Sequence, residues 1–150
     1  MPPPKPTQKS DSAHVEQQQP TAKVYLDTPG GEVAVNVEVV NTEPKIERGL
    51  MYREHLPLDA GMLFMMGYEK DWSFWMKNTL IPLDMIFIKK DMTIAGISQN
   101  AEPQTETLRK VGVASLYVLE VNGGWTQSTG VVAGAKVRFE GVPAAEPAPR

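Results

Sequence analysis

The 150-residue chain contains no cysteine and only two histidines. Without cysteine it has no disulfide, no thiolate nucleophile and no sulfur-ligated zinc site. His14 and His55 are far apart in the sequence, so they do not form a metal-ligand pair at close spacing. No serine stands in a nucleophile-elbow setting. We therefore expect no metal site and no cofactor, and the absence of a recognisable catalytic motif favours a protein that is not an enzyme.

The chain also lacks a strong charge of either sign. Its formal net charge is −3, its basic residues are scattered, and no segment alternates Lys or Arg with aromatic residues. Nucleic-acid surfaces concentrate positive charge, so nucleic acid is not an expected partner. No apolar run approaches the roughly 20 residues that span a bilayer. These features predict a soluble protein, which we expect to be a monomer.

Residues 1–21 have the composition of a disordered tether. They are rich in proline, glutamine and serine, and Val15 is almost their only large apolar residue. Such a segment buries too little apolar surface to offset the entropy lost on ordering. Residues 142–150 have the character of a second tail. A single domain at 22–141 remains between them.

A spacer of this kind at the start of a chain suggests that the natural precursor carries an export signal or a lipid anchor upstream of Pro2. We therefore expect an extracytoplasmic location, in the periplasm or cell envelope. The only contact with a membrane that we expect is the one that this possible N-terminal anchor of the precursor would make. The alternative interpretation is the flexible end of an ordinary cytosolic protein.

Strand patterns dominate the predicted domain. Apolar and polar residues alternate at 33–40, and short β-rich runs recur along the chain. The predicted strands are 23–27, 33–40, 62–66, 73–77, 83–89, 92–99, 114–121 and 135–140. Thr42 and Pro44 mark the start of a short helix that ends near Met51, and a helical turn is expected at 125–129. This pattern predicts a mainly β fold with a minor helical part, in which about eight short strands form a small antiparallel β-barrel or sandwich-like sheet.

The segment 48–88 places charged residues inside apolar runs, where each is costly to bury without a partner. In the predicted strands, Glu120 shares an apolar face with Val118, and Asp84 shares one with Ile86. We infer a ligand-binding cluster of mixed charge with a stacking surface, formed by Arg53, Lys77, Asp84 and Glu120 together with Asn78, Thr79 and Trp75. The alternative is a set of ordinary ion pairs that fix a loop to the sheet.

Six of the eight methionines lie in the same segment. Thioethers favour copper(I), but Met65 and Met66 would point to opposite faces of one strand. Methionine also fills irregular cores, so we predict core packing for these residues. For Trp75 and Trp125, packing at the core or its rim is the alternative to stacking on a sugar or an aromatic ligand.

Several ordered stretches of the chain resemble a known family. They are Glu47–Arg53, Leu56–Pro57, Gly61–Phe64, Phe74–Asp84, Tyr117–Glu120 and Gly124–Gly134. With these stretches the chain resembles the prokaryotic domain of unknown function 192 family, over about Val24 to Phe139. The resemblance implies a compact β-rich domain, often exported or lipid-anchored in bacteria, and no established activity. Many exported members carry a cysteine pair in the loop that corresponds to residues 100–111, and this chain has none there.

Three functions are compatible with these features. The leading hypothesis is a non-enzymatic cell-envelope binding module that holds an unknown small molecule or an envelope protein at the mixed-charge cluster. The second is a hydrolase or lyase in which Asp84 and Glu120 act as a paired acid and base. The third is a structural or partner-docking domain without a ligand, in which the cluster only stabilises the fold.

Overall fold

The computed structural model describes residues 22–144, so the predicted tether and most of the predicted tail lie outside the described residues. The elements in chain order are β2 (Ala22–Thr28), β3 (Gly31–Val40), α1 (Glu43–Arg48), β4 (Ala60–Lys70), β5 (Leu83–Ile88), β6 (Ile94–Ala101), β7 (Ser115–Asn122), α2 (Trp125–Thr129) and β8 (Val137–Glu140). Neither of these two helices has the length and apolar character needed to cross a membrane. The prediction of a mainly β fold with one or two short helices is confirmed.

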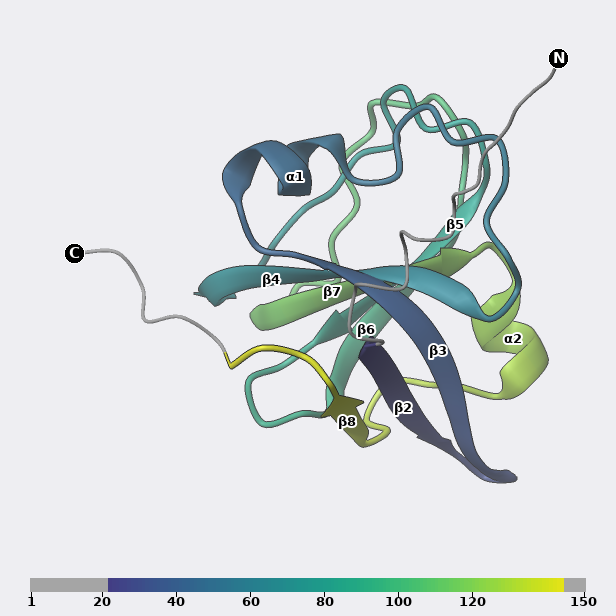
Figure 1. Cartoon of the computed structure of the whole chain (residues 1–150), viewed down its shortest axis with the longest axis vertical. Helices are drawn as coiled ribbons and strands as arrows, with labels where there is room; N and C mark the ends of the chain where they lie inside the picture. The colour runs from purple at the N-terminus through teal and green to yellow at the C-terminus, as the bar shows by residue number, and fades with distance from the viewer. Residues whose placement is uncertain (1–21, 145–150) are drawn as a thin grey trace, which may run out of the picture.

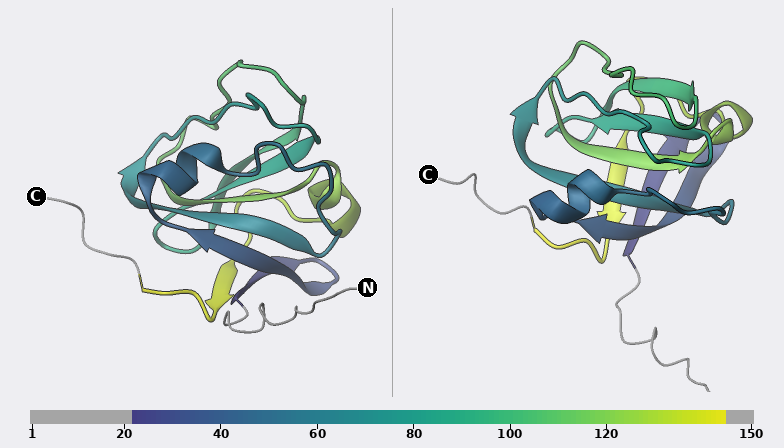
Figure 2. Two further views of the ribbon diagram at one scale, coloured as in Figure 1. Left: turned by 45° about the horizontal axis from the view of Figure 1, so that its top comes forward. Right: turned by 90° about the horizontal axis from the view of Figure 1, so that it is seen from above.

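The seven strands form one sheet in the order β6-β5-β7-β4-β3-β2-β8. The sheet curls into a half-barrel (Figure 1), and the same curvature is visible from two further directions (Figure 2). The two edge strands approach each other at one corner. There the N–H groups of Ile94 and Val137 donate hydrogen bonds to the carbonyl oxygens of Ala135 and Met92, both at 2.9 Å. These bonds join the beginnings of β6 and β8 and partly close the curl.

Adjacent strands run antiparallel, as predicted, except for β3 and β4, which are parallel. A parallel pair needs a crossover connection, because the chain must return to the same end of the sheet before the second strand begins. Here α1 and residues 49–59 make that connection. The crossover therefore lies over one face of the sheet (Figure 1), where it can cover apolar side chains.

The sheet buries apolar side chains on both faces. The inner core, inside the curl, draws on every strand and consists of Val24, Leu26, Val35, Leu63, Ile86, Ile88, Ile94, Leu119, Val121, Val131 and Val137. The outer core, on the other face, consists of Val40, Leu50, Leu56, Met62, Phe64, Met76, Leu83, Met85, Phe87, Ala101 and Val118. Three methionines belong to it, as the core-packing prediction requires. Every residue of β5 is buried, so a polar side chain in this strand has no hydrated face available.

The predicted strand at 73–77 is wrong, and the sheet has seven strands where about eight are expected. In this segment only Phe74 makes a β-bridge, with Arg109. Met76 donates its N–H to the carbonyl oxygen of Thr105 at 2.9 Å, so the segment pairs with another loop. Phe74 and Met76 cover the outer core. Their hydrophobicity therefore reflects a buried loop, which short apolar runs cannot distinguish from a strand.

The buried carboxylate of Asp84 ties β5 to β6 and α2. Its Oδ1 accepts hydrogen bonds from the backbone N–H groups of Asn100 at 2.8 Å and Gly124 at 3.1 Å. Its Oδ2 accepts bonds from the N–H and the hydroxyl of Thr126, at 2.9 and 2.7 Å. The close turn depends on Gly123, because a Cβ there would lie 2.8 Å from the Asn100 side-chain oxygen. Four donors thus compensate for the burial of this charge.

We expect Asp84→Asn to lower the free energy of unfolding by about 2–4 kcal/mol, because an amide would turn a donor toward groups that are themselves donors. Urea denaturation at neutral pH measures this loss. Asp27→Asn is the matched control, since Asp27 is exposed. A loss at Asp84 no larger than that of the control would contradict a stabilising role for this network.

Candidate functional site

Three loops are joined over the outer core, and we call them the loop cap: residues 49–59, 71–82 and 102–114. The Tyr52 N–H donates to the carbonyl oxygen of Asn78, and the Gln104 N–H donates to that of Thr79, both at 2.9 Å. Tyr52, Asn78 and Gln104 have φ angles of 67°, 56° and 60°. Positive φ is uncommon outside glycine, and such residues cluster at functional sites. The loop cap is therefore strained at the contacts that hold it together.

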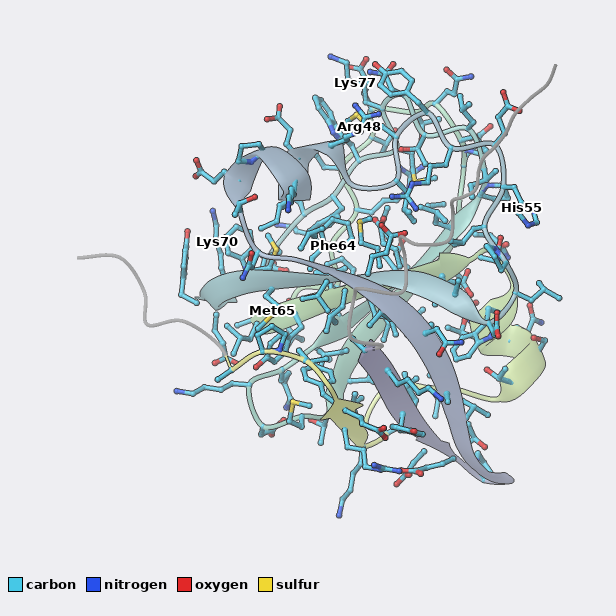
Figure 3. The ribbon with its side chains drawn as sticks, viewed as in Figure 1. Arg48, His55, Phe64, Met65, Lys70 and Lys77 are labelled. Atoms are coloured by element: carbon cyan, nitrogen blue, oxygen red, sulfur yellow. The ribbon has the colours of Figure 1, made fainter. Side chains whose placement is uncertain are left out.

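A pocket of about 350 Å³ lies between α1 and the loop cap, and we call it the outer pocket. Its apolar wall consists of Ile46, Leu50, Met51, Phe64, Met66, Trp72, Phe74, Trp75 and Leu108. Phe64 points from β4 toward this side of the sheet, and Met65 points to the other side (Figure 3). The rings of Phe64 and Phe74 meet edge to face, with centroids 5.0 Å apart. A concave, aromatic space of this size suits a small organic molecule.

Among the described residues, Glu120 contributes the only ionisable group that reaches the outer pocket from the sheet. It lies in β7 between Met62 of β4 and Met85 of β5, and only 4% of the residue is exposed. Within residues 22–144, no hydrogen bond or ion pair reaches its carboxyl oxygens, and burial is the one influence acting on its charge. Buried polar groups nearly always have a partner. In residues 22–144 the fully buried side-chain oxygen or nitrogen without a partner is Ser115 Oγ, so the unpartnered oxygens of Glu120 keep slight exposure, on the side of the outer pocket.

Burial raises the pKa of Glu120 from its ordinary 4.5 to about 8. The cause is desolvation, because methionine and aromatic side chains replace the water that would stabilise the charged form. At neutral pH the group holds its proton and can donate a hydrogen bond as well as accept one. A carboxyl group with such a shift in a concave site is a marker of function.

The predicted mixed-charge cluster does not form, because its two carboxyl groups lie on opposite faces of the sheet. Asp84 is opposite Val121, a residue of the inner core, whereas Glu120 is opposite Met85, a residue of the outer core. Directly opposite residues share a face of a sheet, and successive residues alternate between faces. The face predicted for each carboxyl group within its own strand is correct. The inference that the two groups meet is wrong, and a paired acid and base at these residues lacks its geometry.

The basic residues of the predicted cluster lie apart from both carboxyl groups. Arg53 pairs with Glu38, with Nη2 2.9 Å from Oε1, beside a second and larger groove of about 960 Å³. Lys77 is exposed, and its ammonium group lies 5.1 Å from the centre of the Trp75 ring. In Figure 3, Lys77 lies among the loops at the top of the view. Exposed pairs of this kind contribute little to stability.

Two of the six predicted ligand-binding residues, Trp75 and Glu120, line the outer pocket. Trp75 is 37% exposed, so its ring is available to a ligand. Asn78 contributes its carbonyl oxygen to the loop contact with Tyr52. A ligand-binding role for each of the six, including Arg53, Lys77 and Asp84, stays a prediction.

Sequence reasoning missed most of the pocket wall, including Phe64, Trp72 and Phe74. These residues come from separate segments that meet only in the folded chain, and a wall made of loops has no helical or strand period. One local signal was available at Gly49, which ends α1 with φ 50°. A Cβ there would lie 3.3 Å from the Phe64 ring, so glycine lets the chain pass close to the pocket.

We expect Glu120 to make the protein less stable as pH rises from about 5 to about 8. The folded protein holds the proton up to about pH 8, while the unfolded chain releases it near 4.5, so rising pH favours the unfolded chain between these values. The contribution is about 1.4 kcal/mol per pH unit in this window. Urea denaturation at several pH values measures it.

Glu120→Gln removes the titrating group with little change in shape, so the difference in unfolding free energy between wild type and this variant should follow that pH slope. Glu106→Gln serves as the control, because Glu106 is exposed and should leave the slope unchanged. A constant difference between wild type and Glu120→Gln across the window would show that Glu120 is ionised in the folded protein.

Residues 24–139 match the model of the DUF192 family, described as Uncharacterized ACR. A crystal structure described as a "putative transcription regulator" from Sinorhizobium meliloti 1021 is 38% identical, with a TM-score of 0.78 over 83% of this chain and 97% of that chain. A protein of unknown function from Novosphingobium aromaticivorans DSM 12444 is 33% identical, with a TM-score of 0.78 over 85% of this chain and 91% of that chain. No curated protein matches the chain. The resemblance carried by its sequence stretches is therefore confirmed: the chain belongs to the DUF192 family, a family of unknown function.

Proposed function

We propose that this protein is a binding module that holds a small organic molecule in the outer pocket, with Glu120 as its polar anchor. The observation that carries this function is the buried carboxyl group, which has no partner in the described chain and borders a pocket of about 350 Å³. A ligand that bonds to Glu120 would supply the missing partner. The aromatic wall would bury the apolar part of that ligand.

A binding function is better supported than a catalytic one in which Asp84 and Glu120 act as a pair. Both oxygens of Asp84 are engaged by four donors on the far face of the sheet, so Asp84 is not available to a ligand at Glu120. Glu120 is therefore the only acid that the sheet brings to the pocket within residues 22–144, and the other acid of its lining, Glu47, is exposed on α1. One acid can orient and hold a molecule, whereas the paired mechanism needs two groups on one substrate.

The location in the cell envelope is also our proposal. It is supported by the Pro/Gln/Ser-rich composition of residues 1–21 and by the exported or lipid-anchored character that the family resemblance implies. An envelope module would meet its ligand outside the cytoplasm.

Regulation of transcription, which the description of one relative names, receives less support from this chain if it is to act by binding DNA. The net charge is −3, and both described helices have six residues or fewer. A surface that neutralises phosphates needs a concentration of basic residues that the sequence does not provide.

The binding role can be tested by closing the outer pocket. Ser73 is exposed and lines the pocket, so the indole of Ser73→Trp should fill the space without disturbing the cores. A panel of small organic molecules should include compounds that raise the Tm of the wild type by about 2 °C or more, and Ser73→Trp should lose that response. Differential scanning fluorimetry measures both.

Thr107→Trp is the matched control, because Thr107 is exposed on a neighbouring part of the loop cap and the change adds the same side chain. It should keep the ligand response. Compounds that stabilise Ser73→Trp as much as the wild type would place their site elsewhere and contradict the proposed function. If no compound of the panel raises the Tm of the wild type, the structural alternative, a domain without a ligand, is favoured.

The proposed location has its own test. A copy tagged at the C-terminus and expressed from its natural reading frame should fractionate with envelope or periplasmic markers. Recovery with cytoplasmic markers alone would contradict it.

A further inference from the structure

We propose, building on the binding function above, that the group which the ligand places against Glu120 is an organic cation, an ammonium or an amidinium, carried by an apolar or aromatic body. This proposal goes beyond the presence of a ligand and names its chemical class. It follows from the polar groups that the outer pocket offers, from those that are already engaged, and from the aromatic residues of its wall.

The buried and half-buried residues of the outer pocket offer few free donors to an anionic ligand, and its other charged residues, Glu47 and Arg48, line it from the exposed side of α1. The Thr79 hydroxyl already donates to the carbonyl oxygen of Lys77 at 3.2 Å, and the Trp72 indole N–H donates to that of Tyr68 at 3.2 Å. The guanidinium of Arg48 lies over the ring of Tyr52, 5.5 Å from its centre. An anion placed deep in the pocket would therefore meet the Glu120 carboxyl group without a buried positive charge to balance it.

The aromatic residues of the wall favour a cation. Trp72 and Trp75 both line the outer pocket, and each already attracts an ammonium group to its ring. Lys70 lies 5.0 Å from the Trp72 ring, and Lys77 lies 5.1 Å from the Trp75 ring. An indole ring is the side chain that attracts cations most strongly, and the attraction grows when water is excluded. Because Lys70 and Lys77 already occupy part of these rings, a ligand cation would use only the ring surface that they leave open and would gain mainly from the Glu120 carboxylate.

Binding of a cation must release a proton. Free Glu120 carries its proton at neutral pH, and an ammonium pairs favourably with the carboxylate form, so the Glu120 O–H bond breaks and the proton passes to the solvent. The complex then contains one positive and one negative charge, which neutralise each other. Affinity for a cation should therefore rise with pH until Glu120 ionises in the free protein. A neutral ligand that accepts the Glu120 proton in a hydrogen bond would show the opposite dependence.

Three probes of nearly equal size distinguish these cases: 2-phenylethylamine, 2-phenylethanol and phenylacetate. Isothermal titration calorimetry with the full chain should rank the amine first at pH 8. Its affinity should fall roughly fifty-fold between pH 8 and pH 6, the change expected when binding requires ionisation of a group of pKa about 8. Titrations at pH 7 in two buffers of different ionisation enthalpy should report release of about 0.9 proton per amine bound.

Glu120→Gln should weaken the amine most and remove both the pH dependence and the proton release, while Glu106→Gln should change neither. Tightest binding of the alcohol or the acid, or amine binding without proton release, would overturn the cation assignment and leave the pocket's binding function standing. The cation assignment also fails if a panel compound of another class occupies the pocket and all three probes are silent. Amine binding that survives intact in Ser73→Trp would instead overturn the pocket itself.

Discussion

The burial of β5 and β7 on both faces is the constraint on which the rest of the structure depends. The half-barrel has an apolar core inside its curl and another beneath the loop cap, so these strands have no hydrated side. A carboxyl group in either strand must find donors, hold its proton or destabilise the fold. Asp84 and Glu120 occur in adjacent strands, and each represents one of these outcomes. Asp84 receives four hydrogen bonds, while Glu120 receives none from the described chain and keeps its proton.

The difference between the two carboxyl groups follows from what covers each face. Asp84 lies where β6, the turn after β7 and the start of α2 bring three backbone N–H groups and one hydroxyl within reach. Its bonding capacity is used in holding these elements to β5. Glu120 lies beneath loops that present mainly side chains of Trp, Phe, Leu and Met, and none of the described residues donates a hydrogen bond to its carboxyl group. On one face of the sheet the covering elements thus bond to Asp84 and stabilise the fold. On the other face the loop cap leaves Glu120 without a bond, and the candidate function lies there.

The sequence predicts much of this arrangement within single strands and little of it between them. Alternation places Asp84 with Ile86 and Glu120 with Val118, and both placements are correct. Whether the two acids share a face depends on the register of β5 against β7, which no local pattern encodes. The strand predicted at 73–77 is wrong because the hydrophobicity of a buried loop resembles that of a short strand. The sequence therefore marks Glu120 as a carboxyl group on an apolar face, but the partners inferred for it are wrong.

The fold itself gives no reason for a carboxyl group at position 120. An apolar side chain of similar volume would pack against Met62 and Met85 without desolvating an acid, and replacements of buried charges by apolar residues are often neutral or stabilising. The positive φ angles of Tyr52, Asn78 and Gln104 belong to contacts within the loop cap, and none of these three residues lines the outer pocket. The buried acid is thus a departure from the most stable arrangement, and it lies against the outer pocket. Proteins place such departures where binding or chemistry compensates for them, and the outer pocket is where this chain can recover that free energy, from a molecule that completes the bonding of Glu120.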